Sequence, residues 1–373
     1  STFTYQVYGN FSRGLFDEKF RKRAADWKAS QNNPDDHKDY GLSTYNFHRD
    51  GSGVAYSSHL RPLLTWRPDF MTFYDEAGSG LRHLPADTHL TGWLDRLGIA
   101  FDVVTDHDLH EKGVEILAGY KVVVTGTHPE YHTAQTLDAL QAYTETGGRL
   151  MYLGGNGFYW RVALSDAVPG AIEVRRTEGG IRTWPAEPGE YYHSFDGAYG
   201  GLWRRSDRPP NLLCGIGFSS QGLFVGDSYR RSPAARDNHH AWIFEGVKDE
   251  VFGGYGFSGG GAAGFELDRL DHRLGSPLNA VVLASSEGHD RKEFVVVHEE
   301  RLGFNTTVPG ESLDDLIRAD MTYIEKPQGG AVFSTGSITY CGSLPHNGYD
   351  NDVSRLTFNV INRFGELGLK WPF

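Results

Sequence analysis

An imidazole, a carboxylate and a second imidazole follow a strand-like run of three valines, as His128, Glu130 and His132 at alternate positions. In open α/β sheets, ligands bind outside the carboxyl ends of strands, so such a fold places its chemistry at this point. A structural interpretation competes with the functional one. Thr127 would cap a following helix, Pro129 would occupy its first turn, and Glu130 would interact favourably with the helix dipole. The segment alone leaves both interpretations open.

Two further segment ends carry polar side chains of the same kind. They are Tyr8-Gly-Asn10 after residues 2–8, which we interpret as the first strand, and Gly154–Gly157, which contains Asn156. If the strands are parallel neighbours, these ends meet the His128–Glu130 segment in one cleft. A long loop containing Tyr45 and His48 can fold over it. Phenolate and carboxylate oxygens suit a hard cation such as Fe(III), which would lower the pKa of bound water and polarise a carbonyl. Packing remains the alternative role for each tyrosine.

Familiar nucleophile and phosphate-binding motifs are missing from the sequence. There is no GxSxG elbow, no P-loop, no HExxH and no GxGxxG after the first strand. Neither Cys214 nor Cys341 follows the valine run, where a cysteine amidotransferase would carry its nucleophile. Covalent thiol chemistry is therefore disfavoured.

Charge and cysteine content restrict the partners and the compartment. The 36 basic and 48 acidic residues give a formal net charge of −12, which disfavours nucleic acid and anionic membranes as partners. No stretch approaches the length of a transmembrane helix. Two cysteines without CxxC spacing indicate a reducing compartment. We expect the cytoplasm, with a bacterial periplasm as the alternative.

Apolar periodicity predicts an α/β fold with a doubly wound, mainly parallel sheet. Between residues 70 and 153, predicted strands (one at 101–104) alternate with helical patterns, as parallel sheets require. Short strands separated by Gly, Pro and Asp follow, and α/β character returns near the end. We therefore predict an α/β domain formed by residues 1–170 and 328–373, and a mainly β insertion or lobe at 171–327.

These residues resemble a known family, the C-terminal part of the large (beta) subunit of N,N-dimethylformamidase. The similarity covers essentially the whole chain. The matching segments are Thr4-Tyr-Gln-Val-Tyr-Gly-Asn10, Gly41-Leu-Ser-Thr-Tyr-Asn46, Thr127-His-Pro-Glu-Tyr-His-Thr133, Leu153-Gly-Gly-Asn-Gly-Phe-Tyr-Trp160 and a closing pattern within 329–362. The resemblance implies a fold similar to class I glutamine amidotransferases and flavodoxin.

The resemblance also implies an amidohydrolase with one non-haem Fe(III) per chain, held by two tyrosines and a glutamate. Carried over by motif, Glu130 is the carboxylate ligand and Tyr45 is one phenolate ligand. The second phenolate comes from the first strand, where we prefer Tyr8 and keep Tyr5 as the alternative. Side chains alternate along a strand, so only one of these two would point into the site.

His128 and Asn156 are the accompanying polar residues that the resemblance implies. In metal-assisted hydrolysis of N,N-dimethylformamide to formate and dimethylamine, His128 would move protons and Asn156 would donate to the oxyanion. Phe47 and Trp160 would form a dry pocket for the N-methyl groups. We expect a hetero-oligomer with a small subunit and the N-terminal region of the large subunit. A non-catalytic binding or scaffold domain that lacks the nucleophilic cysteine is the alternative function.

Overall fold

The computed structural model describes residues 1–11, 34–68, 70–72, 80–177, 183–286, 288–290, 292–297 and 313–373. Part of the long loop predicted before residue 68, residues 12–33, lies outside this description. Within it, no helix combines the length and apolar character needed to cross a bilayer.

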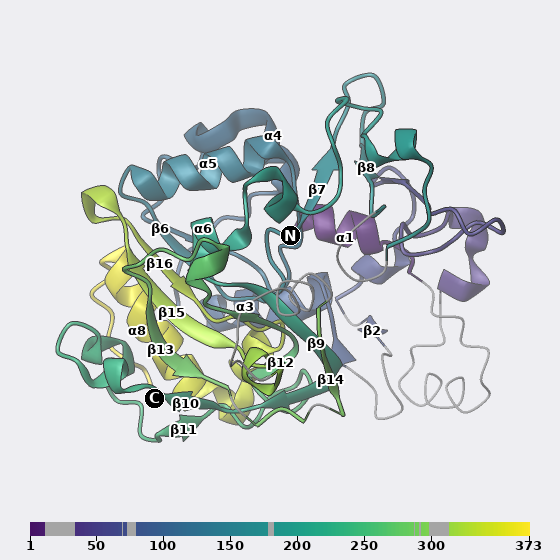
Figure 1. The fold of residues 1–373 in the computed structure, drawn as a ribbon. Coiled ribbons are helices and arrows are strands. Elements are labelled where there is room, and N and C mark those ends of the chain that lie inside the picture. Colours follow the sequence, from purple (N-terminus) through teal and green to yellow (C-terminus); the bar gives the residue numbers. More distant parts are fainter. Residues whose placement is uncertain are drawn as a thin grey trace.

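A seven-stranded mixed sheet forms the centre of the molecule (Figure 1). Its strands, in spatial order, are β11 (Val251–Phe252), β10 (Tyr229–Arg231), β13 (Val281–Ser285), β15 (Asp320–Glu325), β16 (Ala331–Ser334), β6 (Arg149–Tyr152) and β4 (Val122–Val124). Only the pairs β16–β6 and β6–β4 are parallel. The other four pairs are antiparallel.

The predicted doubly wound, mainly parallel sheet of the flavodoxin or class I amidotransferase type is therefore wrong. Residues 101–104 form no strand, so one expected βα unit before β4 is missing. Strands β15 and β13, from the segment assigned to a β lobe, instead extend the same sheet: β15 pairs antiparallel with β16, and β13 pairs antiparallel with β15. Alternating periodicity shows that strands and helices are present, but it does not show which strands pair. The predicted domain boundaries stay a prediction.

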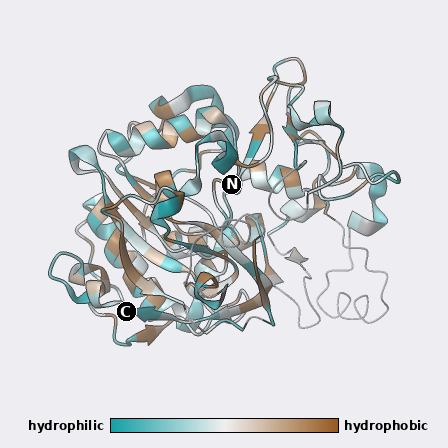
Figure 2. Cartoon of the chain, in the orientation of Figure 1, coloured by the Kyte–Doolittle hydropathy of each residue, from teal (hydrophilic) through white to brown (hydrophobic). Residues whose placement is uncertain are grey.

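Helices cover both faces of this sheet. The six helices of the described chain are α1 (Thr2–Tyr8), α3 (Leu84–Arg96), α4 (Asp106–Lys112), α5 (Ala134–Glu145), α6 (Pro210–Cys214) and α8 (Asp352–Gly365). On β6, Met151 packs in one core cluster with α3 and α8, whereas its neighbours Leu150 and Tyr152 pack in another with α5. Burial on both faces explains why the central strands are so apolar in Figure 2.

Smaller sheets flank the central one. A four-stranded sheet runs in the order β1 (Tyr56–Ser58), β8 (Ala171–Val174), β7 (Trp160–Ala163) and β5 (Tyr131–His132); a three-stranded sheet consists of β12 (Ala263–Arg269), β9 (Gly217–Asp227) and β14 (Phe294–Val296); β2 (Met71–Thr72) pairs with β3 (Gly80–Leu81). Two of these strands matter for function, because β5 directly follows Glu130 and β12 contains Glu266.

The first element, α1, is a helix and not the predicted strand. Its β-branched and aromatic residues favour a strand locally, but tertiary packing overrides this preference, and Phe3 to Tyr8 are all buried. The Asp106 carboxylate, at the start of α4, accepts hydrogen bonds from the Phe3 backbone N–H at 2.9 Å and from the Thr2 hydroxyl at 3.3 Å. A residue distant in sequence thus caps the helix.

We predict that Asp106→Ala lowers the free energy of unfolding by about 0.5–2 kcal/mol, because the first turn of α1 loses its carboxylate acceptor. Denaturant unfolding of the purified variant measures this loss. Asp95→Ala, at an exposed position late in α3, is the control and should stay within about 0.5 kcal/mol of the parent. Equal stabilities of the two variants would show that the contact between α1 and α4 contributes nothing.

Candidate active site

Glu130 is fixed by its backbone between α1 and two sheets. Its carbonyl oxygen accepts hydrogen bonds from the Tyr159 and Trp160 backbone N–H groups at 2.9 and 3.0 Å, which joins the segment after β4 to the segment after β6. Its own N–H donates to the Thr4 hydroxyl of α1 at 3.0 Å. The two carboxyl ends of parallel strands therefore meet as expected, and the carboxylate projects from a rigid position.

The Tyr8 and Tyr45 phenols are brought together at the end of α1. The Ser43 and Thr44 hydroxyls donate to the Val7 carbonyl oxygen at 3.1 and 3.0 Å, which ties the loop to the helix. The rings of Tyr8 and Tyr45 then stack with their centres 4.1 Å apart. Tyr45 Oη donates to Tyr8 Oη at 2.6 Å.

All five residues predicted for the site lie together. Glu130 Oε1 is 3.4 Å from Tyr45 Oη and 3.2 Å from Asn156 Nδ2, and its Oε2 is 3.2 Å from His128 Nε2. Each of the five, Tyr8 included, is at most 8% exposed. The roles assigned to these residues stay predictions.

The other candidates from the sequence lie elsewhere or bond to the fold itself. Tyr5 points away and donates to the Asp87 carboxylate. His132 is buried but its ring contacts the Thr136 hydroxyl at 3.1 Å and the Pro129 carbonyl oxygen at 3.0 Å. His48 is exposed, and Phe47 is 52% exposed.

Glu266 is a site residue that the sequence analysis missed. Its Oε2 lies 3.0 Å from His128 Nε2 and accepts a hydrogen bond from Asn156 Nδ2 at 3.2 Å. The backbone of β12 approaches so closely that a Cβ at Gly155 would lie 2.6 Å from the Glu266 carbonyl oxygen. Glu266 and Asp268 alternate with apolar residues on a strand that is buried throughout, and such inward carboxylates were the available signal.

Asn156 adopts a left-handed conformation that the fold must hold in place. Its φ is +48°, which non-glycine residues rarely adopt. Asp268 Oδ1 accepts a hydrogen bond from the Asn156 backbone N–H at 2.7 Å, and Asp268 Oδ2 accepts one from the Tyr152 hydroxyl at 2.6 Å. The conformation directs the Asn156 amide between Glu130 and Glu266.

Arg82 determines the tautomer of His128. Its Nη2 lies 3.1 Å from His128 Nδ1, and a guanidinium can only donate, so Nδ1 must be the unprotonated nitrogen. The proton of the neutral ring is then on Nε2, between Glu266 and Glu130. Burial lowers the pKa of His128, and the Arg82 charge lowers it further against the opposing effect of Glu266.

Tyr131 and Arg176 complete the polar cluster, and neither was predicted. Tyr131 Oη lies 2.6 Å from Tyr45 Oη and accepts a hydrogen bond from Arg176 Nη1 at 3.0 Å. Arg175 and Arg176 directly follow β8, and Arg176 is the one of the two that is buried. The two adjacent arginines were the only feature of the sequence that could have indicated a buried cation here.

The buried acidic groups disfavour one another's charge. Burial, followed by the negative charge of Glu266, raises the pKa of Glu130 to about 8. Burial and the Glu130 charge raise the pKa of both Tyr8 and Tyr45 far above the ordinary value. Burial also tends to raise the pKa of Glu266, but the charges of His128 and Arg82 and the hydrogen bonds to it outweigh this effect, so its pKa is lowered.

A cavity of about 20 Å³ lies between these groups. It is lined by Tyr8, Tyr45, Glu130, Asn156, Tyr159, Trp160, Phe218, Gln221 and Glu266. That volume holds one ion or one water. Within the described residues, Glu130 Oε2 and Asn156 Oδ1 accept no hydrogen bond although both are buried.

The donor set fits a hard cation. No group of three or more His, Cys, Asp or Glu side chains in the described ranges is arranged to hold a metal ion, so a metal here would depend on phenol oxygens. Two phenols and a carboxylate offer hard oxygen ligands. A cation between them would also reverse the electrostatic cost that raises their pKa values.

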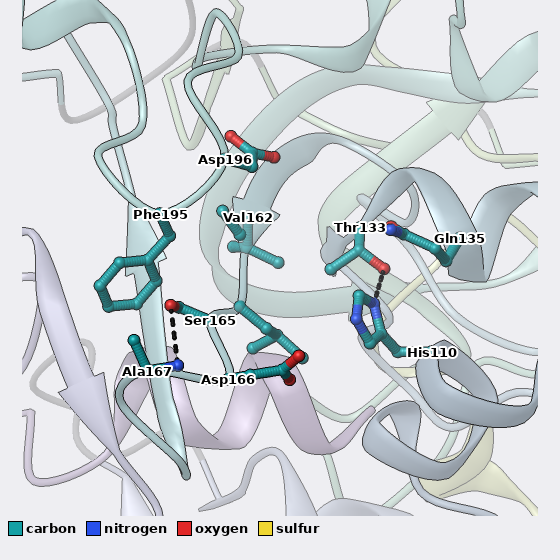
Figure 3. A pocket seen from close by; sticks show the side chains of 11 residues that line it. His110, Thr133, Gln135, Val162, Ser165, Asp166, Ala167, Phe195 and Asp196 are labelled. Atoms are coloured by element: carbon teal, nitrogen blue, oxygen red, sulfur yellow. Dashed lines mark hydrogen bonds between the residues drawn. The ribbon is translucent and has the colours of Figure 1, made fainter.

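A larger groove of about 400 Å³ lies elsewhere and contains none of the predicted residues (Figure 3). Polar side chains such as His110, Ser165 and Asp166 line it, and His110 Nδ1 lies 2.9 Å from the Thr133 hydroxyl. Asp166 and Asp196 are exposed. The groove is therefore a solvent-facing surface feature, whereas the predicted site residues surround the smaller cavity.

Comparison with known proteins assigns the family of this chain. The family model described as "N,N-dimethylformamidase beta subunit-like, C-terminal" matches residues 1–351. The chain therefore belongs to that family, as the sequence motifs indicated. Among curated relatives, it is 41% identical over 376 residues to the N,N-dimethylformamidase beta subunit of Paracoccus aminophilus, and 43% identical over 326 residues to that of an Alcaligenes species.

These matches cover 98% and 87% of this chain but only 48% and 42% of the relatives, so the chain spans less than half of their length. Among solved structures, the "mmIFT52 N-terminal domain" matches 72% of this chain and 84% of its own, with 13% identity and a TM-score of 0.31. A similarity that low carries no argument about fold or function.

We predict that Glu130→Gln stabilises the metal-free protein relative to the parent as the pH rises from about 5 to 8. The unfolded carboxyl ionises near its ordinary pKa, whereas the folded one stays protonated until about pH 8, so the parent loses stability in this window. Glutamine cannot ionise. Urea unfolding of chelator-treated protein at both pH values measures the difference, with the exposed Glu115→Gln as control. A difference that does not change with pH would contradict the burial argument.

Proposed function

We propose that this chain is the catalytic part of an iron-dependent amidohydrolase. Its substrate would be N,N-dimethylformamide or a similar small N-substituted amide, cleaved to formate and dimethylamine. The observation that carries the proposal is the convergence of Tyr8, Tyr45 and Glu130 oxygens on one buried cavity, in a chain of this family.

In this proposal, Tyr8, Tyr45 and Glu130 hold one Fe(III) per chain. When bound, iron supplies a Lewis acid that polarises an amide carbonyl and lowers the pKa of a water. Tyr8 is preferred to Tyr5, because the Tyr8 hydroxyl contacts Tyr45 whereas the Tyr5 hydroxyl bonds Asp87. Glu130 Oε2 accepts no hydrogen bond, although it lies 3.2 Å from His128 Nε2, and this supports its assignment as the carboxylate ligand.

Glu266 is the group best placed to accept a proton. Its lowered pKa keeps it ionised, and it lines the cavity. We propose that Glu266 removes a proton from the attacking water while the water oxygen forms a bond to the formyl carbon. The C–N bond then breaks with its electron pair on nitrogen, and Glu266 returns the proton to that nitrogen. Dimethylamine leaves, and the formic acid ionises to formate.

His128 and Asn156 support Glu266 in this scheme. The Nε2 proton of His128 lies beside the Glu266 carboxylate, and Arg82 prevents Nδ1 from carrying a second proton, so His128 orients Glu266 instead of moving protons itself. The Asn156 amide bridges Glu130 and Glu266 through Nδ2. Its use as an oxyanion donor would require it to give up one of these two bonds.

Substrate binding requires side chains to move, because the cavity holds only an ion or a water. Trp160 and Phe218 are its apolar walls, and we propose that they contact the N-methyl groups. Phe47, the other residue expected to contact these groups, is 52% exposed and does not line the cavity. The relatives are named as beta subunits, and we propose that this chain also works in a hetero-oligomer with a small subunit and the N-terminal region of a large subunit.

We predict that Glu130→Ala and Tyr45→Phe lose bound iron, whereas Tyr5→Phe keeps about one iron per chain. The first two remove an oxygen ligand, and the third only breaks a bond to Asp87. Metal analysis of the purified proteins measures this. A parent without iron that neither takes up the metal nor cleaves formamides would instead support the scaffold alternative. Equal iron in Glu130→Ala and the parent would refute the ligand assignment.

We predict that Glu266→Gln keeps its iron but lowers kcat by roughly 10²- to 10⁴-fold, the usual contribution of a general base. The amide retains the shape of the side chain but cannot accept the proton of water. Steady-state kinetics with N,N-dimethylformamide, together with metal analysis, measures both effects. Gln221→Ala, which alters another residue of the same cavity wall, is the matched control and should reduce kcat far less. Unchanged kcat in Glu266→Gln would remove Glu266 from the mechanism.

A further inference from the structure

The buried guanidinium of Arg176 has unusual partners. The residue is 1% exposed, its Nη1 donates to the Tyr131 hydroxyl at 3.0 Å, and its Nη2 donates to the Thr44 carbonyl oxygen. It also lies against the rings of Tyr45 and Trp184. Within the described residues, none of its hydrogen bonds or ring contacts goes to a carboxylate. Its direct partners are therefore neutral, although its charge also acts on the buried Glu130 carboxyl group.

Arg176 interacts with Tyr45 in two ways, directly through the Tyr45 ring and indirectly through the Tyr131 hydroxyl. Its guanidinium carbon lies 3.7 Å from the centre of the Tyr45 ring. It also donates to Tyr131, whose oxygen lies 2.6 Å from Tyr45 Oη. Because the Tyr131 oxygen accepts from Arg176, the single Tyr131 hydrogen is available to donate to Tyr45.

Both interactions favour negative charge on the Tyr45 oxygen. A cation over the face of an aromatic ring attracts its electrons, and a hydrogen bond to a charged oxygen is stronger than one to a neutral oxygen. A phenolate at Tyr45 would in turn place a negative charge in direct contact with the Arg176 guanidinium, which the neutral phenol does not. The Thr44 carbonyl contact holds the guanidinium to the same loop, so the arrangement also restrains the ring.

We propose that Arg176 and Tyr131 are positioning residues for Tyr45, which fix its ring and stabilise its phenolate. They thereby increase the energy needed to transfer an electron from Tyr45 to a bound Fe(III). This inference rests on the proposed function, because it requires iron at Tyr45. Partners outside the ligand set commonly tune a metal site in this way.

The test is the visible absorption band that arises from tyrosinate-to-iron charge transfer. In iron-loaded Tyr131→Phe and Arg176→Gln, the band should move to longer wavelength, and iron affinity should fall by roughly 10- to 100-fold. Tyr229→Phe is the matched control, since it removes a buried hydroxyl that bonds the Thr335 carbonyl oxygen in a different core cluster. Its band should coincide with that of the parent.

The outcomes separate this inference from the proposed function. A parent without any such band refutes the proposed function, and the inference with it. A parent band that stays unshifted in both variants refutes the inference alone. If Arg176→Gln fails to fold, Tyr131→Phe still decides, because it keeps the ring and removes only the hydroxyl. Arg176→Lys keeps the positive charge, so its band should lie between those of Arg176→Gln and the parent. A band at the same wavelength as that of Arg176→Gln would contradict the role of the charge.

Discussion

The site depends on acidic oxygens that are held together out of water. Tyr8, Tyr45, Glu130 and Glu266 face one small cavity, and burial together with mutual repulsion disfavours the charged forms of the first three. Such an arrangement is unfavourable by itself. It persists because bonds made by other groups fix it: Thr4 holds the Glu130 backbone, and Ser43 holds the Tyr45 loop to α1. A cation bound between these groups would relieve their unfavourable electrostatic energy.

The fold brings these groups and Asn156 together from five places in the chain. Helix α1 carries Tyr8, the loop capping its end carries Tyr45, the carboxyl ends of β4 and β6 precede Glu130 and Asn156, and β12 carries Glu266. The parallel pairing of β4 with β6 brings Glu130 and Asn156 together, and the other groups come from elements outside the central sheet. The antiparallel strands beyond β16 extend the core without contributing a ligand. Arg82 and Arg176 then surround the acidic groups with positive charge and restrict the orientation of His128 and Tyr45.

The sequence predicted the convergence of the site better than the fold that produces it. The motifs around Tyr8, Tyr45, Glu130 and Asn156 were specific enough to mark those residues. They did not show that Tyr8 lies on a helix, because the strand preference of residues 2–8 is overridden by packing and by the distant Asp106. Apolar periodicity also could not predict the order of the strands in the sheet, because the pairing of β15 with β16 is decided by contacts between residues distant in sequence. Glu266, Tyr131 and Arg176 were missed because their roles arise only from what they face in three dimensions.

We propose that Tyr8, Tyr45 and Glu130 surround one iron ion. An anomalous-difference map, recorded at the iron edge from crystals of iron-replete protein, tests this most directly. We expect a single strong peak between those three oxygens. Iron-containing crystals with no peak there, or with the peak at other side chains, would contradict it.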